Sequence, residues 1–287
     1  MAILTSPPLN FPIDEIQYRI SHIKDNSADI IAKSKELQRK LTFKETITDE
    51  DEKRRLDNAD SVFEQQLIEL ISKKFVNDHF LCENKGIVLG KNDYRWIIDA
   101  IDGSMNFLRG LPLYAISLGL CYRDSIVAGV IIIPDSQELY YAIHGNGAYK
   151  NEAQIQVSSI NMIDRAFLIS SFPSSRTSNM REVITEISAF VSCARSVRRS
   201  GSFILDMCWL AEGKIDGIWE KEVGVFDACA SLLLVTEARG MVTNYKGEAI
   251  YTSTINPQPT SFISSNGLIH NQIIEVLNKT RNELSLN

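Results

Sequence analysis

The residues best able to do chemistry lie in one segment, residues 96–107, which reads WIIDAIDGSMNF. An apolar run ends in Asp99 and Asp102, and Gly103 and Ser104 follow directly. Carboxylates at a strand end can bind a hard cation, and backbone N–H groups at a following helix start can bind phosphate. Because Asp, Gly and Ser also favour turns and helix caps, a turn in which both aspartates act only as caps is an equal alternative for this segment alone.

Two further acids shift the balance toward metal chemistry. Glu83 follows the apolar Phe80 and Leu81, and Asp227 opens an apolar helical pattern. An unpaired charge beside such core-like segments is unfavourable. If the four carboxylates converge, each pair about 4 Å apart repels by roughly 4 kcal/mol at an effective dielectric near 20, so cations must balance them. An oxygen-only set without histidine or thiol favours Mg²⁺.

Composition and charge exclude several function classes. The 287 residues are 44% hydrophobic and 23% charged, which is ordinary for a globular protein with a sizeable core. The formal charge of −6 argues against a general nucleic-acid-binding surface, which needs a basic excess. Five widely spaced cysteines without a CxxC pair indicate reduced structural thiols. With no leader-like start and no apolar stretch of roughly 18 residues, we expect a cytoplasmic protein without a membrane partner.

Hydrophobic periodicity predicts the elements that must position these acids. Apolar residues near helical spacing predict one long amphipathic helix over residues 11–40 and a second over residues 59–75. The dense mixed charges of residues 42–58 predict an exposed, mobile loop between them, with a merely solvated connector as an equal alternative. Short apolar runs separated by turn residues predict antiparallel strands at residues 96–99, 115–122, 126–134 and 138–143.

The second part of the chain alternates more between strands and helices. Strands are predicted at residues 166–170, 215–219, 241–243 and 262–265. Helices are predicted at residues 181–191, 202–212 and 227–239. The absence of repeats and of a Pro/Gly/Ser-rich linker favours a single domain over residues 1–287, with two intimately packed halves at about 11–158 and 159–280.

Taken together, the motifs resemble the inositol monophosphatase family. Its first signature, WxxDPxDGTxNF, corresponds to WIIDAIDGSMNF, and its second, WDxAxxxLxxxEAGG, corresponds to FDACASLLLVTEARG. HFLCEN aligns with the family's FxGEE element, and the resemblance covers roughly residues 59–266. It implies an α/β fold of αβαβα layers, with an antiparallel sheet in the N-terminal half and a mixed sheet in the C-terminal half. It also implies a homodimer.

The resemblance also implies roles for individual residues. About two or three Mg²⁺ ions would be held by side chains and one backbone carbonyl, those of Glu83, Asp99, Ile101, Asp102 and Asp227. Glu83 and Ser104 would orient and help deprotonate a metal-bound water, with Asp99 as a further catalytic group, and attack on phosphorus would be direct. Substrate contacts would come from Asp102, Gly103, Ser104, Gly201, Ser202, Phe203, Glu220 and Asp227.

Several positions depart from the family pattern, although none of them removes a ligand. Ala100 replaces proline, Cys82 replaces glycine, Asn84 replaces a second glutamate, Phe226 replaces tryptophan and Arg239 replaces glycine. Phe203 stands where relatives that hydrolyse inositol phosphate usually have a small residue, and a phenyl ring there can reshape the substrate pocket. By the same resemblance, Asp60 aligns with an acidic residue near the family's active site, and the charged segment before it corresponds to the family's flexible loop, which closes over a weakly held third metal.

The sequence therefore predicts a Mg²⁺-dependent, lithium-sensitive phosphatase that acts on inositol monophosphate or a similar small polyol or sugar phosphate. Fructose-1,6-bisphosphatase, 3'-phosphoadenosine-5'-phosphate nucleotidase and histidinol-phosphatase activities on the same fold remain alternatives, because a fold does not choose its substrate. A non-catalytic binding relative is the hypothesis from another class, motivated by Cys82, Asn84 and Phe203.

Overall fold

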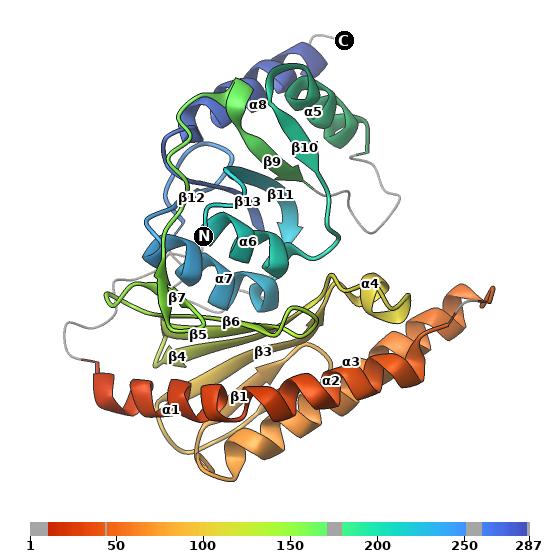
Figure 1. Cartoon of the computed structure of the whole chain (residues 1–287), viewed down its shortest axis with the longest axis vertical. Helices are drawn as coiled ribbons and strands as arrows, with labels where there is room; N and C mark the ends of the chain where they lie inside the picture. The colour runs from red at the N-terminus through yellow and green to blue at the C-terminus, as the bar shows by residue number, and fades with distance from the viewer. Residues whose placement is uncertain (1–10, 44, 171–179, 251–259, 286–287) are drawn as a thin grey trace.

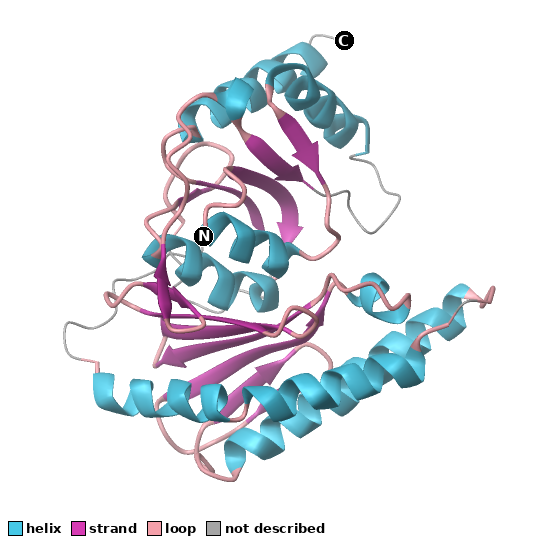
Figure 2. Ribbon diagram, viewed as in Figure 1, coloured by secondary structure: helices cyan, strands magenta, loops and turns pink. Residues whose placement is uncertain are grey.

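Helices and sheets alternate in five layers, in the order αβαβα (Figure 1, Figure 2). A computed structural model describes residues 11–43, 45–170, 180–250 and 260–285. Helices α1, α2 and α3 cover one face of an eight-stranded sheet, α6 and α7 lie between this sheet and a five-stranded one, and α5 and α8 cover the far face. The predicted αβαβα architecture is therefore confirmed.

The first layer begins with two helices in place of the single one predicted over residues 11–40. Helix α1 (Ile13–Asp25) and helix α2 (Ser27–Leu41) run nearly end to end and meet at Asn26 (Figure 1). Asn26 has φ −103° and ψ 5°, and its side-chain amide donates to the carbonyl oxygen of His22 at 2.7 Å. This local bond competes with the helical pattern and interrupts it.

The prediction of a loop over residues 42–58 is wrong for most of that segment, because helix α3 (Asp49–Ser72) begins ten residues earlier than expected. The Thr48 side chain caps it by accepting from the N–H of Asp51 at 3.1 Å. Four acidic residues in the first turn suit the positive end of the helix dipole. Mixed charges that suggested a solvated loop thus belong to an exposed, capped helix end.

The eight-stranded sheet has the order β2-β1-β3-β4-β5-β6-β7-β8. All neighbouring pairs are antiparallel except β1 and β3, which are parallel, so the predicted antiparallel sheet is correct for all but one pair. The short strands β1, β2, β7 and β8 were not among the strands predicted from the hydrophobic pattern. The strands are β1 (His79–Cys82), β2 (Gly86–Val88), β3 (Tyr94–Asp102), β4 (Ala115–Tyr122), β5 (Ser125–Ile133), β6 (Glu138–Ile143), β7 (Ala148–Lys150) and β8 (Ala153–Ile155).

The five-stranded sheet has the order β10-β9-β11-β13-β12, and it is mixed as predicted. Strand β9 pairs in parallel with β10 and β11, whereas β13 pairs antiparallel with β11 and β12. Its strands are β9 (Phe167–Ser170), β10 (Ser196–Arg198), β11 (Gly217–Val223), β12 (Met241–Thr243) and β13 (Thr260–Ser265). Strand β11 runs to Val223, beyond the predicted end at residue 219, and so includes Glu220.

The outer helices on this sheet are α5 (Met180–Cys193) and α8 (His270–Ser285). Helix α8 was not predicted, because its buried apolar positions Ile273 and Leu277 are few and lie among polar residues. A 3₁₀ turn, η1 (Ile163–Arg165), precedes β9. None of the described helices is both long and apolar enough to cross a membrane.

Helices α6 (Phe203–Ala211) and α7 (Val225–Glu237) form the central layer, and α4 (Ser104–Leu108) lies at its edge. Glycines on the first sheet let α7 approach closely. A Cβ added at Gly119 would lie 2.3 Å from Sγ of Cys229, and one at Gly129 would lie 2.7 Å from Cβ of Ala230. This close contact holds the N-terminus of α7 beside the end of β3.

Arg239, which follows the C-cap of α7, adopts a left-handed backbone with φ +68°. Because a side chain disfavours this conformation, we expect Arg239→Gly to raise the free energy of unfolding by about 1 kcal/mol. Urea unfolding of both proteins measures the difference. Arg239→Ala removes the side chain but keeps the strain, so it serves as the control and should leave stability near that of the parent chain. A glycine variant no more stable than the alanine variant would contradict the prediction.

Candidate active site

Strand β3 carries two of the predicted acids, Asp99 and Asp102, to the edge of the first sheet. Its pairing with β4 shifts register between them, which marks a β-bulge. Asp99 is 5% exposed, and its Oδ1 accepts from the N–H of Ile101 at 3.1 Å. Gly103 follows with φ +87°, and a Cβ there would lie 2.8 Å from the carbonyl oxygen of Leu113. Only glycine can therefore turn the chain here from β3 into α4.

Asp102 is held by the N-terminus of a helix from the other half of the chain. Its Oδ2 accepts from Oγ of Ser202 and from the N–H of Ile204, the latter at 2.8 Å. Ser202 is also the N-cap of α6 and accepts from the N–H of Leu205 at 3.3 Å. These bonds join the end of β3 to the central helical layer. They also place a carboxylate against the positive end of a helix.

Asp227 comes to the same place at the start of α7. The helix begins at Val225, two residues before the predicted start, because Gly224 is its N-cap. Oδ2 of Asp227 accepts from the N–H of Gly224 at 3.1 Å. The carboxylate of Asp227 can therefore cap the helix and also bind a metal ion, because a carboxylate has several lone pairs.

Three acids from these two elements converge. Oxygen atoms of Asp99, Asp102 and Asp227 all lie within 4.8 Å of one another, the one such cluster in the described part of the chain. Two unit charges at that distance repel by roughly 3.5 kcal/mol at an effective dielectric near 20. The donor set consists of carboxylate oxygens alone, which fits a hard divalent cation. This cluster can therefore hold metal.

The fourth predicted acid, Glu83, lies at the edge of this cluster and is exposed rather than buried in the core. It follows β1 and lines a cavity of about 340 Å³. The same cavity is lined by Ile101, Ser104 and the three clustered acids, as well as by Asp57 and Asp60 on α3. The structure thus brings all the predicted metal-site residues to one cavity, with Glu83 at its rim.

The acids raise one another's pKa values in the absence of a cation. Burial, with the charge of Asp227 next, raises the pKa of Asp102 to about 7, despite the bond from Ser202. Burial and the neighbouring carboxylates raise the pKa of Asp99 well above its ordinary value. Burial followed by the charge of Glu83 raises the pKa of Asp60 to about 8. A cation that binds here must therefore displace protons from the acids.

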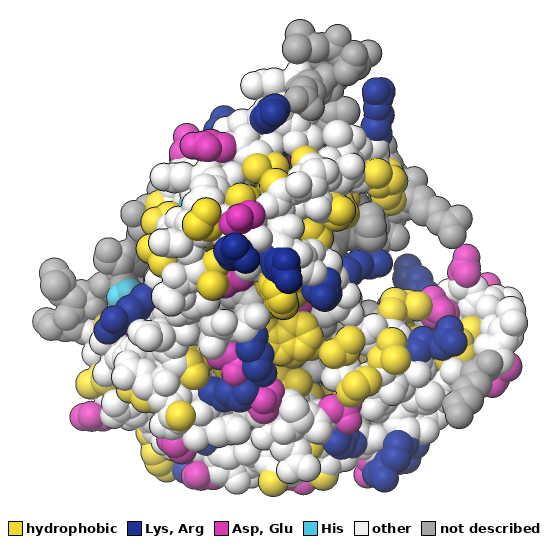
Figure 3. All heavy atoms as spheres, turned by 45° about the horizontal axis from the view of Figure 1, so that its top comes forward, with side chains coloured by type: hydrophobic (Ala, Val, Ile, Leu, Met, Phe, Trp, Pro, Cys, Tyr) yellow, Lys and Arg dark blue, Asp and Glu magenta, His cyan; other side chains and the backbone are white. Residues whose placement is uncertain are grey.

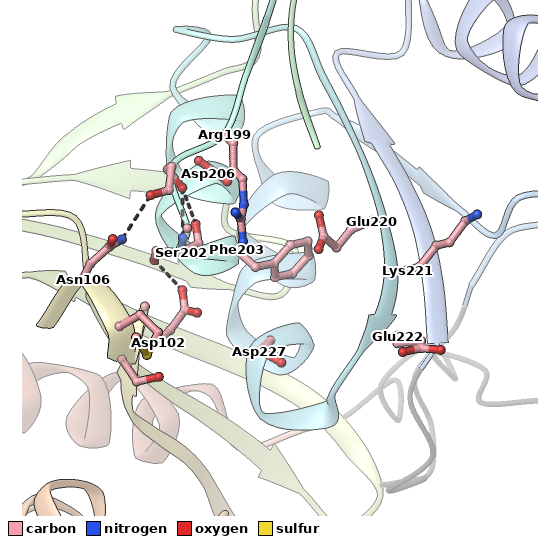
Figure 4. A pocket seen from close by; sticks show the side chains of 15 residues that line it. Asp102, Asn106, Arg199, Ser202, Phe203, Asp206, Glu220, Lys221, Glu222 and Asp227 are labelled. Carbon is pink, nitrogen blue, oxygen red and sulfur yellow. Dashed lines mark hydrogen bonds between the residues drawn. The ribbon is translucent and has the colours of Figure 1, made fainter. Parts of the chain in front are cut away.

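A larger cavity of about 660 Å³ opens beside the cluster (Figure 4). The ring of Phe203, the first residue of α6, points toward Glu220 on β11 in this view. Gly201 has φ +89°, and Nδ2 of Asn106 would lie 3.1 Å from a Cβ there. All the predicted substrate residues line this cavity: Asp102, Gly103, Ser104, Gly201, Ser202, Phe203, Glu220 and Asp227.

Sequence reasoning missed Asp57, Arg199 and Asp206 at the site, and it missed Glu64, which bonds to the turn after Glu83. Asp57 lines the smaller cavity, and Arg199 and Asp206 line the larger one. Burial raises the pKa of the Asp206 carboxyl well above its ordinary value. The helical spacing of Asp57 and Glu64 was a usable signal, since seven residues are two turns, but it requires α3 to begin before Ala59.

The raised pKa values predict how stability depends on pH. A carboxyl whose pKa rises from 3.8 to about 7 on folding stabilises the folded state below its unfolded pKa, and this stability is lost as pH rises through about 7. The melting temperature of the metal-free protein should therefore fall between about pH 5 and about pH 8, and Mg²⁺ should restore it at the upper end.

Asp99→Asn removes one of the repelling charges, so it should flatten this pH dependence and weaken the restoration by Mg²⁺. Differential scanning calorimetry with and without Mg²⁺ measures both effects. Asp29→Asn is the matched control, because Asp29 lies on α2 in an exposed pair with Lys33. A metal-free melting temperature that does not change with pH would contradict the prediction.

The chain is similar in sequence to known proteins of one family. The model of the inositol monophosphatase family matches residues 16–285. The chain is 33% identical over 200 residues to "Nus factor SuhB" of Haemophilus influenzae, covering 69% of this chain and 75% of that protein. It is 31% identical over 239 residues to "Fructose-1,6-bisphosphatase/inositol-1-monophosphatase" of Aquifex aeolicus, covering 82% and 86%.

A solved structure agrees with these sequence relatives. The inositol monophosphatase from Anabaena (Nostoc) sp. PCC 7120 superposes with a TM-score of 0.76 at 27% identity, covering 92% of this chain and 97% of that one. The fold, the converging acids and the family match are consistent with one another. The chain therefore belongs to the inositol monophosphatase family and is a phosphatase, a phosphoric monoester hydrolase.

Proposed function

We propose that this phosphatase depends on Mg²⁺ and hydrolyses inositol monophosphate or a similar small polyol or sugar phosphate. The observation that carries the proposal is the opening of the acidic cluster into a cavity with Phe203 and Glu220 on its wall. Glu220 can accept hydrogen bonds from hydroxyl groups, and the ring of Phe203 can cover the carbon face of a small ring. A volume of about 660 Å³ is ample for such a ligand.

The catalytic roles in this proposal are distributed among the residues at the two cavities. Asp99, Asp102, Asp227, Glu83 and the carbonyl of Ile101 would hold about two or three ions. Bound Mg²⁺ would supply activation of water and neutralisation of the phosphoryl oxygens.

Glu83 and Ser104 would orient the attacking water and help to deprotonate it, with the carboxylate of Glu83 as the proton acceptor. The bonds from Ser202 and Ile204 to Asp102 would keep that carboxylate from moving during turnover.

A sugar bisphosphatase activity is the second candidate, because a specific residue favours it. Arg199 lines the larger cavity together with Glu220, and a guanidinium group at this wall can bind a second phosphate group. The Aquifex aeolicus relative is named for both fructose-1,6-bisphosphatase and inositol-1-monophosphatase. Retention of the whole acidic cluster argues against the non-catalytic hypothesis.

The proposal extends to organisation and partners. We expect one domain over residues 1–287 that acts as a cytoplasmic homodimer on a small phosphorylated metabolite, without a membrane partner. The Haemophilus influenzae relative is named a Nus factor, which makes a macromolecular partner an alternative. On the face in Figure 3, basic side chains are interspersed with acidic and apolar ones, and the net charge of −6 favours a protein over a nucleic acid.

Phosphate release with Mg²⁺ tests the proposal directly. The panel comprises inositol-1-phosphate, fructose-1,6-bisphosphate, 3'-phosphoadenosine-5'-phosphate and histidinol phosphate. Preference for the first supports the proposal, and preference for the second supports the second candidate. Asp99→Asn should lower turnover by at least about 100-fold and is the inactive control. Inhibition by millimolar Li⁺ is expected, and activity that persists there counts against the inositol-type assignment.

Phe203→Ala should change substrate preference more than it changes metal binding. Removing the ring takes away its contact with the substrate, so we expect KM for the preferred ring substrate to rise by about 5-fold to 10-fold. The affinity for Mg²⁺, measured by calorimetry, should stay near that of the parent chain. Phe203→Tyr keeps the ring and is the conservative control. An unchanged KM for every substrate in the panel would show that Phe203 does not contact the ligand.

A further inference from the structure

We propose that Glu64 is a positioning residue, whose buried carboxylate fixes the turn after β1 and thereby holds Glu83 at the site. The inference rests on the proposed function, because it assigns Glu83 its orientation for Mg²⁺ binding and water attack. Glu64 lies on α3, one turn after Asp60, so it acts from the layer of helices beneath the first sheet (Figure 1).

Two backbone hydrogen bonds carry the proposal. Oε1 of Glu64 accepts from the N–H of Asn84 at 3.0 Å, and Oε2 accepts from the N–H of Lys85 at 3.0 Å. Glu64 is only 1% exposed, so its carboxylate is largely shielded from bulk water, and the two bonds are partly buried. Bonds to an ionised acceptor are stronger than neutral ones, and a bidentate pair also fixes orientation. The two donors are the residues that directly follow Glu83.

Strand β3 pairs with β1 and holds the start of the turn, but the β2 side of the turn has few other restraints. Strand β1 is four residues long, and its hairpin partner β2 is a three-residue strand at the edge of the sheet. Ile87 and Val88 on β2 are exposed, so they add little packing energy. The carboxylate of Glu64 ties this edge hairpin to α3, the helix that also carries Asp60 to the smaller cavity.

Two backbone N–H donors need two acceptor oxygens, which the carboxylate of Glu64 supplies and a neutral amide does not. None of the ion pairs in the described part of the chain includes Glu64. The carboxylate also lies one turn of α3 from Asp60, which lines the smaller cavity. The carboxylate of Glu64 thus adds a negative charge near the acidic cluster. The two hydrogen bonds that it accepts fix the turn that follows Glu83.

The test compares Glu64→Gln with the parent chain. The amide keeps one acceptor oxygen but turns a donor toward the second N–H, so one of the two bonds is lost. We expect Mg²⁺ affinity, measured by isothermal titration calorimetry, to fall by about 10-fold, the size typical of losing a group that orients a ligand. Protection of the Asn84 and Lys85 amides from hydrogen exchange should fall as well.

Kinetics separate positioning from a simple loss of charge. At saturating Mg²⁺, kcat should remain about 10-fold low while KM for the preferred substrate changes by less than about 2-fold, because a misplaced Glu83 is not corrected by more metal. Glu69→Gln is the matched control on the same helix, since Glu69 is exposed and its carboxylate bonds only to Gln65. This control should match the parent chain.

Each outcome decides the proposal. Parental Mg²⁺ affinity and kcat in folded Glu64→Gln would overturn it, whatever the amide protection. If that variant does not fold, Glu64→Asp keeps both acceptors on a shorter stem, and the same comparison applies with a smaller expected loss. A parent chain that binds Mg²⁺ but hydrolyses no phosphomonoester would overturn the proposed function instead, and the Mg²⁺ affinities would still decide the role of Glu64.

Discussion

Mutual repulsion of three carboxylates is the constraint on which the rest of the structure depends. Asp99, Asp102 and Asp227 have oxygens within 4.8 Å of one another, a distance at which bare charges in a partly buried site repel strongly. The fold compensates with backbone and hydroxyl donors at the starts of helices, such as those of Ser202 and Ile204. Burial and the repulsion that these donors do not offset raise the pKa values of Asp99 and Asp102 and favour the binding of a cation.

The layered architecture brings these groups together. Strand β3 belongs to the first sheet, whereas Asp227 belongs to a helix packed between the two sheets. Their approach depends on Gly119 and Gly129, where any side chain would collide with α7. The relative positions of the clustered acids therefore depend on close packing between α7 and the first sheet, at residues other than the acids themselves.

In the proposed function, metal binding and substrate choice depend largely on different elements. The clustered acids and Glu83 lie on β3, on α7 and after β1, whereas Phe203 and Glu220 lie on α6 and β11. Family members can therefore share the acidic cluster and differ in the cavity wall. This separation is the physical reason that a family match identifies a phosphatase without identifying its substrate.

The sequence by itself determined the main strands and the two acids at the end of β3, because hydrophobic period and the DxxDGS spacing are local signals. The αβαβα layers and the wider set of site residues followed from the resemblance to the family. The sequence did not determine that α3 begins at Asp49 or that β1 and β2 form, since a charged helix end and strands of three or four residues carry little periodicity. Only the tertiary structure decided that Glu83 is exposed at the cavity rim and that Glu64 bonds to the turn beside it. Those facts depend on contacts between residues some twenty positions apart, which no local pattern encodes.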